Sequence, residues 1–303
     1  MDTRGFGLVA SWRALTAARG WWKPVAMLAL VGWIPLVGQI AVLGYALEWG
    51  RLAAWGSDGA PRRDGVDVGK VLVCGIRALI VRTPLVVSAG AALWFATGGR
   101  HAVFSPLEAG FYGSWAQAAS TYHIDVPVGI AWLLGLAIGT FVFAAMLRAT
   151  LYDALTAGWR LDRLAQMVAR DASGFLRAAL SVILGAVAVA ALSLLATAAL
   201  DLPLQAGLAG LAAHHGHWHF MFDGGAFLHR LFSLEPASML VAVLGAAAIQ
   251  LACGAVAVAL QLVCVHTVAC WFRRFDVSRW GVSSDPLPPG APSVPGTPSA
   301  PGR

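Results

Sequence analysis

The sequence is poor in charged residues. Asp, Glu, Lys and Arg together make up 12% of its 303 residues, whereas soluble domains carry roughly 25%. Hydrophobic residues make up 58%, and the mean hydropathy is +0.71. This composition argues against a soluble globular domain and predicts an integral membrane protein.

Signatures of catalysis are also absent. The sequence contains no phosphate-binding glycine loop, no serine nucleophile elbow and no paired-carboxylate hydrolase motif. The first twenty residues hold three arginines and no continuous apolar core, so they do not match a cleaved secretory signal. We therefore expect a protein that is not an enzyme and carries no cofactor.

The cysteines and the basic residues argue against two further classes of protein. All four cysteines lie in or beside apolar runs, so we expect buried thiols and no disulfide framework. The formal net charge is +6, but the basic residues are dispersed among segments that flank the apolar runs. This dispersal argues against nucleic acid as a partner and predicts contacts with lipid headgroups.

Long apolar runs are the main feature of the chain. A helix needs roughly 20 apolar residues to cross a hydrocarbon core of about 30 Å. Four runs meet this length, about 71 to 98, 126 to 147, 176 to 200 and 237 to 262. A fifth run, Pro24 to Trp49, is ambiguous because Pro35, Gly38 and Gln39 interrupt it.

The distribution of Lys and Arg favours a hairpin for the fifth run. If all five runs cross, six basic residues flank them on the N-terminal side and 13 on the other. If the first run enters and leaves on one side, the counts become 17 inside and 2 outside. Because positive residues prefer the cytoplasm, this predicts a short re-entrant hairpin and two cytoplasmic termini. We expect protein to cover the turn of such a hairpin.

Two other topologies remain open. The first run can be a single span kinked at Pro35, since proline occurs inside membrane helices. Alternatively, the 71 to 98 run does not span, because it contains Arg77, Arg82 and Pro84. These two arginines are left out of the counts above, and we expect their side chains to extend toward lipid phosphates.

The expected fold class is an all-α membrane protein. It comprises a helical bundle of about four transmembrane helices plus the short re-entrant or kinked N-terminal helical hairpin. Interfacial amphipathic helices are expected near 6 to 20 and 160 to 172. The expected domains are an interfacial amphipathic helix at 1–23, a single transmembrane helical domain at 24–282 and a disordered Pro-rich cytoplasmic tail at 283–303.

Several short motifs between residues 20 and 280 resemble one known family. They are IPLVGQIAVLGYALEWGRLAAWG, VGKVLVCGIRALIV, YDALTAGWRLDRLAQMVARDASGFLRAAL and VHTVACWFRRFD. The family they resemble comprises uncharacterised prokaryotic multi-pass membrane proteins, known as domain of unknown function 4013. The resemblance implies the architecture above and brings no reaction, cofactor or partner, so no residue role is transferred from it.

A histidine-rich segment offers potential metal ligands. The stretch AAHHGHWHFMFDGGAFLHR, residues 212–230, lies in the predicted outer loop between the last two spans. His215, His217 and His219 share a face in a strand, and His215 and His219 share one in a helix. Together with Asp223 they form a candidate zinc or copper site. The alternative is a solvated loop, because no spacing here matches a structural zinc pattern.

Polar residues inside the apolar runs form a second candidate site. Gln250 and Gln261 are eleven residues apart, close to three helical turns, and therefore share one helix face. Together with Gln39 they are candidates for lining a substrate path. The alternative role is hydrogen bonding between helices.

Ion pairing is expected at the end of the first apolar run. Glu48 and Arg51 are three residues apart and therefore neighbours on a helix surface. Arg148 or Arg160 is an alternative partner for Glu48 if the C-terminal ends of these runs pack together.

Two local spacings complete the candidate features. In a helix, His266 shares its face with Cys270 and points away from Cys264, which argues against a closed metal site. Gly135 and Gly139 form a small-residue face that suits close helix packing, either within the chain or in a dimer.

Together these features predict a multi-pass protein of the cell membrane. We expect it to organise the membrane or to act as a subunit of a membrane assembly. The alternatives are a small transporter or permease-like module and an outer-face metal-binding membrane protein. The expected partners are membrane lipids and a membrane-protein partner or a second copy in a homo-oligomer.

Overall fold

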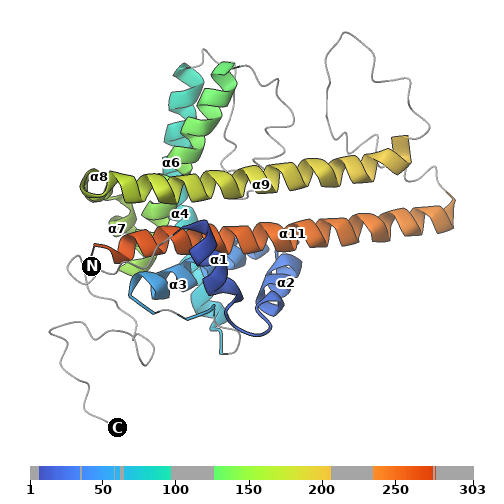
Figure 1. Cartoon of the computed structure of the whole chain (residues 1–303), viewed down its shortest axis with the longest axis horizontal. Coiled ribbons are helices and arrows are strands. Elements are labelled where there is room, and N and C mark those ends of the chain that lie inside the picture. The colour runs from blue at the N-terminus through green and yellow to red at the C-terminus, as the bar shows by residue number, and fades with distance from the viewer. Residues whose placement is uncertain are drawn as a thin grey trace.

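The computed structural model describes residues 7–34, 36–57, 59–61, 65–96, 126–205, 235–275 and 277. Within these ranges all regular structure is helical, which confirms the predicted all-α fold class (Figure 1). In chain order the helices are α1 (Leu8–Thr16), α2 (Trp22–Val31), α3 (Val37–Ala54), α4 (Val68–Ala96), α6 (Val126–Leu151), α7 (Leu155–Trp159), α8 (Leu161–Arg170), α9 (Ala172–Gln205) and α11 (Pro236–Arg273).

Among the described residues, three stretches are long and apolar enough to cross a bilayer. They are Val68–Ala89 in α4, Ala172–Val189 in α9 and Pro236–Arg273, which is the whole of α11. The remaining predicted run forms α6, a helix of 26 residues whose described apolar part is Ile138–Leu151. The chain is therefore a helical membrane protein, and a helix covers each of the four predicted runs.

Aspartate side chains cap the N-termini of two of the long helices. Asp67 accepts a hydrogen bond from the backbone N–H of Lys70 at 3.1 Å, in the first turn of α4. Asp171 accepts one from the N–H of Gly174 at 3.0 Å, in the first turn of α9. Such caps satisfy backbone donors that have no partner within the helix. α11 begins instead with Pro236, whose missing N–H costs little in a first turn.

Two helix pairs cross at the centre of the molecule. α4 packs against α6, and α9 packs against α11. Figure 1 shows the α4 and α6 pair running across the α9 and α11 pair. α3 packs against α4, α6 and α11, while α1 and α2 both pack against α11. The hydrophobic core therefore lies at the crossing.

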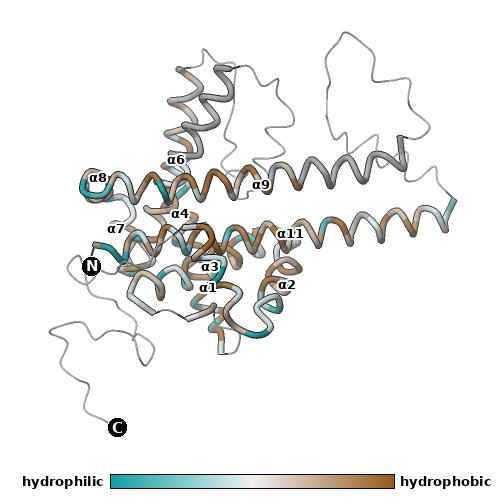
Figure 2. The backbone as a smooth tube through the Cα atoms, in the orientation of Figure 1, coloured by the Kyte–Doolittle hydropathy of each residue, from teal (hydrophilic) through white to brown (hydrophobic). Residues whose placement is uncertain are grey.

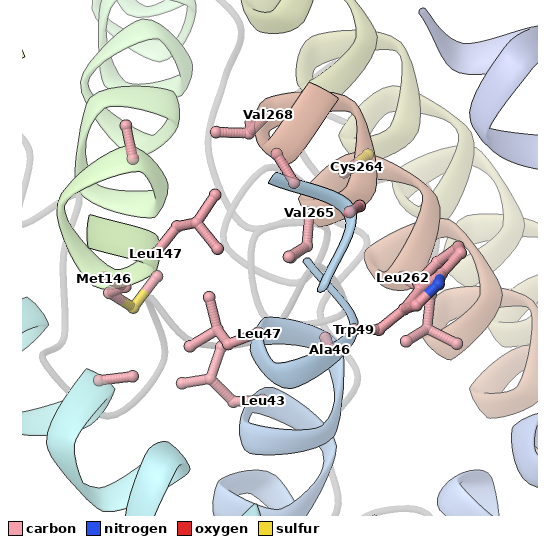
Figure 3. Packing of buried hydrophobic residues seen from close by; sticks show 14 of the residues in the cluster. Leu43, Ala46, Leu47, Trp49, Met146, Leu147, Leu262, Cys264, Val265 and Val268 are labelled. Carbon is pink, nitrogen blue, oxygen red and sulfur yellow. The ribbon is translucent and has the colours of Figure 1, made fainter. Parts of the chain in front are cut away.

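Side chains of α3, α6 and α11 fill this core. Figure 3 shows Leu43 and Leu47 of α3 beside Met146 and Leu147 of α6, with Val265 of α11 close by. Leu47 is 0% exposed and Leu147 is 1% exposed. Lipid tails are as apolar as leucine, so burial alone drives little helix association in a bilayer, and close packing carries more of the stability.

Hydrophobic residues predominate along the long helices (Figure 2), and many of their apolar side chains outside the core are exposed. On α4 and α9 most of the exposed apolar residues are three, four or seven positions apart, which places them on one face of each helix. On α4 and α9 they are Val73, Ile76, Ile80, Val87, Leu176, Leu180, Leu184 and Val187. These stripes fit contact with lipid tails.

The amphipathic helices lie within the predicted ranges. In α8, Leu164 and Met167 are buried whereas Arg163 and Arg170 are exposed. In α1, Ser11 and Leu15 are buried against the rest of the molecule. The division of the chain at residues 23 and 282 stays a prediction, and the tail at 283–303 lies outside the described residues.

Glycines allow the backbones of α3 and α4 to touch. A Cβ atom on Gly44 would collide with the backbone carbonyl of Val71, and one on Gly75 would collide with the carbonyl of Ile40. By contrast, a Cβ on Gly139, part of the predicted small-residue face, would meet nothing within 4 Å. The close helix approach is therefore made by glycines that the sequence analysis did not select.

We expect Gly75→Ala to lower the thermal unfolding midpoint by about 5 °C or more, because overpacking costs about 1–3 kcal/mol and a helix backbone cannot move aside. Gly245→Ala is the matched control, because a methyl group added to this exposed glycine of α11 would meet nothing within 4 Å. It should leave the midpoint unchanged or raise it. Equal midpoints for the two variants would contradict the close α3–α4 contact.

Candidate functional site

The structure gives the three candidate glutamines different environments. Gln261 is buried at 3% exposure in the core part of α11. Gln250 is exposed on the same helix, about 16 Å away along the axis. Gln39 is half-buried in the first turn of α3. A substrate path that uses all three stays a prediction.

The histidine-rich candidate metal site lies outside the described residues. His215, His217, His219 and Asp223 all fall within 206–234, which the structure does not describe. In the part of the chain that is described, no group of three or more His, Cys, Asp or Glu side chains is positioned to hold a metal ion. Metal binding by the 212–230 segment therefore stays a prediction.

A buried polar cluster joins α1 to α11. The hydroxyl of Ser11, which is 1% exposed, lies 2.9 Å from Nδ1 of His266 and 2.9 Å from Oγ1 of Thr267. The imidazole of His266 stacks on the indole of Trp49 from α3, with ring centroids 4.4 Å apart. Sγ of Cys270 lies 3.6 Å from His266 Nδ1. We call these five residues the α1–α11 cluster.

The α1–α11 cluster agrees with the helical spacing of its cysteines. Cys270 contacts His266, whereas Cys264 donates toward the backbone carbonyl of Ser181 on α9 at 3.6 Å. The prediction that only Cys270 shares a face with His266 is therefore confirmed. One thiol and one imidazole fall short of a closed metal site, which needs four ligands. The clear physical role of the cluster is to fasten α1, since a buried hydroxyl needs its partners.

A second group of polar residues gathers at helix ends. Glu48 accepts hydrogen bonds from Arg51 Nε at 2.9 Å and Nη2 at 2.7 Å, which confirms the predicted pair. Lys70 Nζ lies 3.0 Å from the same carboxylate. Arg77 forms an ion pair with Asp153, a residue with a φ of 53° in the turn between α6 and α7. Sequence reasoning missed the last two contacts, because each partner lies on a different element.

Two further contacts connect the residues just after α11 to this region. Arg274, just after α11, pairs with the cap residue Asp171 at 2.6 Å. Tyr152, just after α6, donates a hydrogen bond from its hydroxyl to the carbonyl of Val277 at 3.2 Å. Burial raises the pKa of Tyr152 to about 12, so the phenol keeps its proton at neutral pH and remains a donor. Charged and polar groups thus mark one end of the helical bundle.

We expect Ser11→Ala to destabilise the protein by about 1–2 kcal/mol, because it removes the partner of a buried imidazole and a buried hydroxyl. Thr16→Ala on the same helix is the control, since its exposed hydroxyl bonds only to backbone within α1. Thermal unfolding should show a midpoint loss for Ser11→Ala alone. Equal effects of the two substitutions would show that the α1–α11 cluster does not hold α1.

Comparison with known proteins identifies one family. A family model described as "Protein of unknown function (DUF4013)" matches residues 27–199, from within α2 to within α9. No curated protein and no solved structure gives a significant match. The matched range holds the α3–α4 crossing and the Glu48 and Arg77 ion pairs, and it covers more than half of the chain. This chain therefore belongs to the DUF4013 family of proteins of unknown function.

Proposed function

We propose that this protein is a non-enzymatic, multi-pass protein of the cell membrane that organises the bilayer through a re-entrant hairpin. The hairpin comprises α2, α3 and the turn between them, residues 22–54. It would enter and leave on the cytoplasmic side, alone or within a larger membrane assembly. The observation that carries the proposal is the sharp helix break between α2 and α3, with apolar side chains at its tip.

The length of α2 supports a hairpin over a single kinked span, whereas α3, with 18 residues and a length of about 27 Å, stays within one leaflet only if it is strongly tilted. α2 has ten residues and reaches about 15 Å, half of a hydrocarbon core of about 30 Å. Helical structure then stops until Val37, and Leu36 adopts φ 62° and ψ −61°, close to a classic γ-turn. A Cβ on Gly38 would collide with the carbonyl of Val31, so the two helices meet closely at the turn.

The side chains at the tip suit a lipid environment. Trp33, Ile34, Leu36 and Val37 are each more than half exposed, at 51–54%. A cluster of exposed aromatic and aliphatic side chains beside a helix end is the pattern of a membrane-inserted segment.

Backbone groups of the tip bond within the hairpin. The N–H of Ile34 donates to the carbonyl of Val31 at 2.9 Å, and the N–H of Gly38 donates to the carbonyl of Ile34 at 2.9 Å. The N–H groups of Gly32 and Trp33 also donate to carbonyls of α2. Internal bonds satisfy these four donors, which lowers the cost of placing the turn in the bilayer, and cover of the turn by protein stays a prediction.

An element confined to one leaflet changes the shape of a bilayer. The hairpin would add cross-section to the cytoplasmic leaflet without a matching addition to the other, which favours curvature. The amphipathic helix α8 would act in the same direction if it lies in the headgroup layer, because such helices respond to curvature. The proposed role in membrane organisation follows from this asymmetry.

The sidedness of the hairpin is testable by cysteine labelling. In a background without the four native cysteines, Ser57→Cys and Ser105→Cys would be treated with a membrane-impermeant maleimide on intact cells. We expect only position 105 to react before permeabilisation and both positions to react after it. A single kinked span would place the N-terminal segment and position 57 on opposite sides of the membrane, so reactivity from outside at position 57, or at a cysteine introduced by Thr3→Cys, would contradict the proposal.

The membrane-organising role is testable with reconstituted vesicles. Trp33→Ser combined with Ile34→Ser should return vesicle diameters to those of protein-free liposomes, whereas the unchanged protein yields smaller or tubular vesicles by electron microscopy. Leu180→Ser combined with Leu184→Ser is the matched control, because these side chains of α9 are 53% and 51% exposed. The role is contradicted if both double variants behave alike.

A further inference from the structure

We propose that Arg82 is the cationic centre of an intramembrane site for a phosphate group. The site would lie on the buried face of α4 and accept a phosphate oxyanion, either from a phospholipid headgroup or from a soluble ligand. This inference is independent of the hairpin and of its sidedness.

Arg82 lies at the midpoint of α4. Fourteen residues precede it from Val68 and fourteen follow it to Ala96, so it is about 21 Å along the axis from either helix end. An arginine side chain is much shorter than that distance. The side chain is only 5% exposed, so it is packed inside the molecule and does not extend outward as expected from the sequence.

The face of α4 that carries Arg82 is otherwise apolar. Ala78 and Val86 lie one helical turn before and after it, and they are 0% and 6% exposed. α4 packs against α3, α6 and α7. Nearby polar side chains of α4 bond to their own helix: Thr83 donates to the carbonyl of Leu79 and Ser88 to that of Leu85.

Other buried arginines of the described chain have compensating contacts. Arg51, 4% exposed, forms a two-point hydrogen bond with Glu48. Arg148, also 4% exposed, has one buried nitrogen without a hydrogen-bond partner, Nε, but its guanidinium lies against the ring of Tyr152 and donates toward the sulfur of Met167. For Arg82, Nη2 is buried with no hydrogen-bond partner, and no carboxylate of the described residues forms an ion pair with it.

An uncompensated guanidinium in a protein interior is strongly unfavourable, and this cost favours binding of an anion. The guanidinium presents a planar fork of donors that matches the oxygens of a phosphate group. Charged side chains within membrane segments commonly mark binding or transport sites.

The test uses full-length protein in an uncharged, phosphate-free detergent. Thermal unfolding would be followed with added inorganic phosphate, and separately with short-chain phosphatidylglycerol, each against chloride at equal ionic strength. We expect one of the two ligands to raise the midpoint of the unchanged protein by roughly 5–10 °C near saturation. Stabilisation by the lipid alone assigns the site to a headgroup, and stabilisation by inorganic phosphate assigns it to a soluble anion.

Three variants make the result specific to Arg82. Arg82→Gln should abolish the stabilisation, and Arg82→Lys should reduce it, because lysine keeps the charge and loses the fork. Arg77→Gln is the control, since Arg77 belongs to the same helix but pairs with Asp153. The proposal is overturned if neither ligand stabilises the protein, or if the stabilisation survives Arg82→Gln. The proposal is also overturned if Arg82→Gln has a higher midpoint than the unchanged protein in every condition and neither ligand changes that difference. The Arg82 charge would then only destabilise the protein and bind no anion.

Discussion

Direct backbone contact between α3 and α4 determines the position of the other elements. Gly44 and Gly75 remove the side chains that would separate the two helices. Because apolar burial between helices gains little in lipid, close packing at this contact and in the core, together with a few polar bonds, holds the bundle together. The crossing brings Glu48 at the end of α3 to Lys70 at the start of α4. It also leaves the N-terminal end of α3 and the turn before it projecting with exposed apolar side chains.

Ion pairs and exposed apolar surfaces occupy different parts of the molecule. The ion pairs of Glu48, Arg77 and Asp171 lie where helices begin or end, whereas the outward faces of α4 and α9 are apolar. This arrangement fits a membrane protein whose charged end meets water. Arg82 is a charged exception, because it is buried midway along α4, and the uncharged Gln261 is likewise buried within α11. The two proposals rest on different features, the α2–α3 turn and this arginine.

Much of the fold follows from local sequence. Apolar runs predicted the ends of the long helices to within about five residues, except for α11, which continues eleven residues past the predicted end at 262. The interruption near Pro35 predicted the break before Val37, and helical spacing predicted the Glu48–Arg51 pair. These features depend on neighbours in the chain. The short amphipathic helices α1 and α8 were likewise evident from their pattern of apolar and basic residues.

Contacts between distant segments were not predictable in the same way. Ser11 and His266 are 255 positions apart, and nothing near either residue indicates the other. The burial of Arg82 depends on how α3, α6 and α7 cover α4, and a helical wheel does not contain that information. Likewise, Gly139 has the spacing of a packing motif, yet the close contact forms at Gly44 and Gly75, because helix crossing points are set by the whole bundle.

The central claim is that the turn between α2 and α3 stays within the cytoplasmic leaflet. A fluorophore attached at position 37, whose side chain is 51% exposed, would report its leaflet directly. The protein would be placed in asymmetric vesicles with brominated lipids in one leaflet only. The account predicts several-fold stronger quenching from the cytoplasmic leaflet, whereas equal or stronger quenching from the opposite leaflet would contradict it.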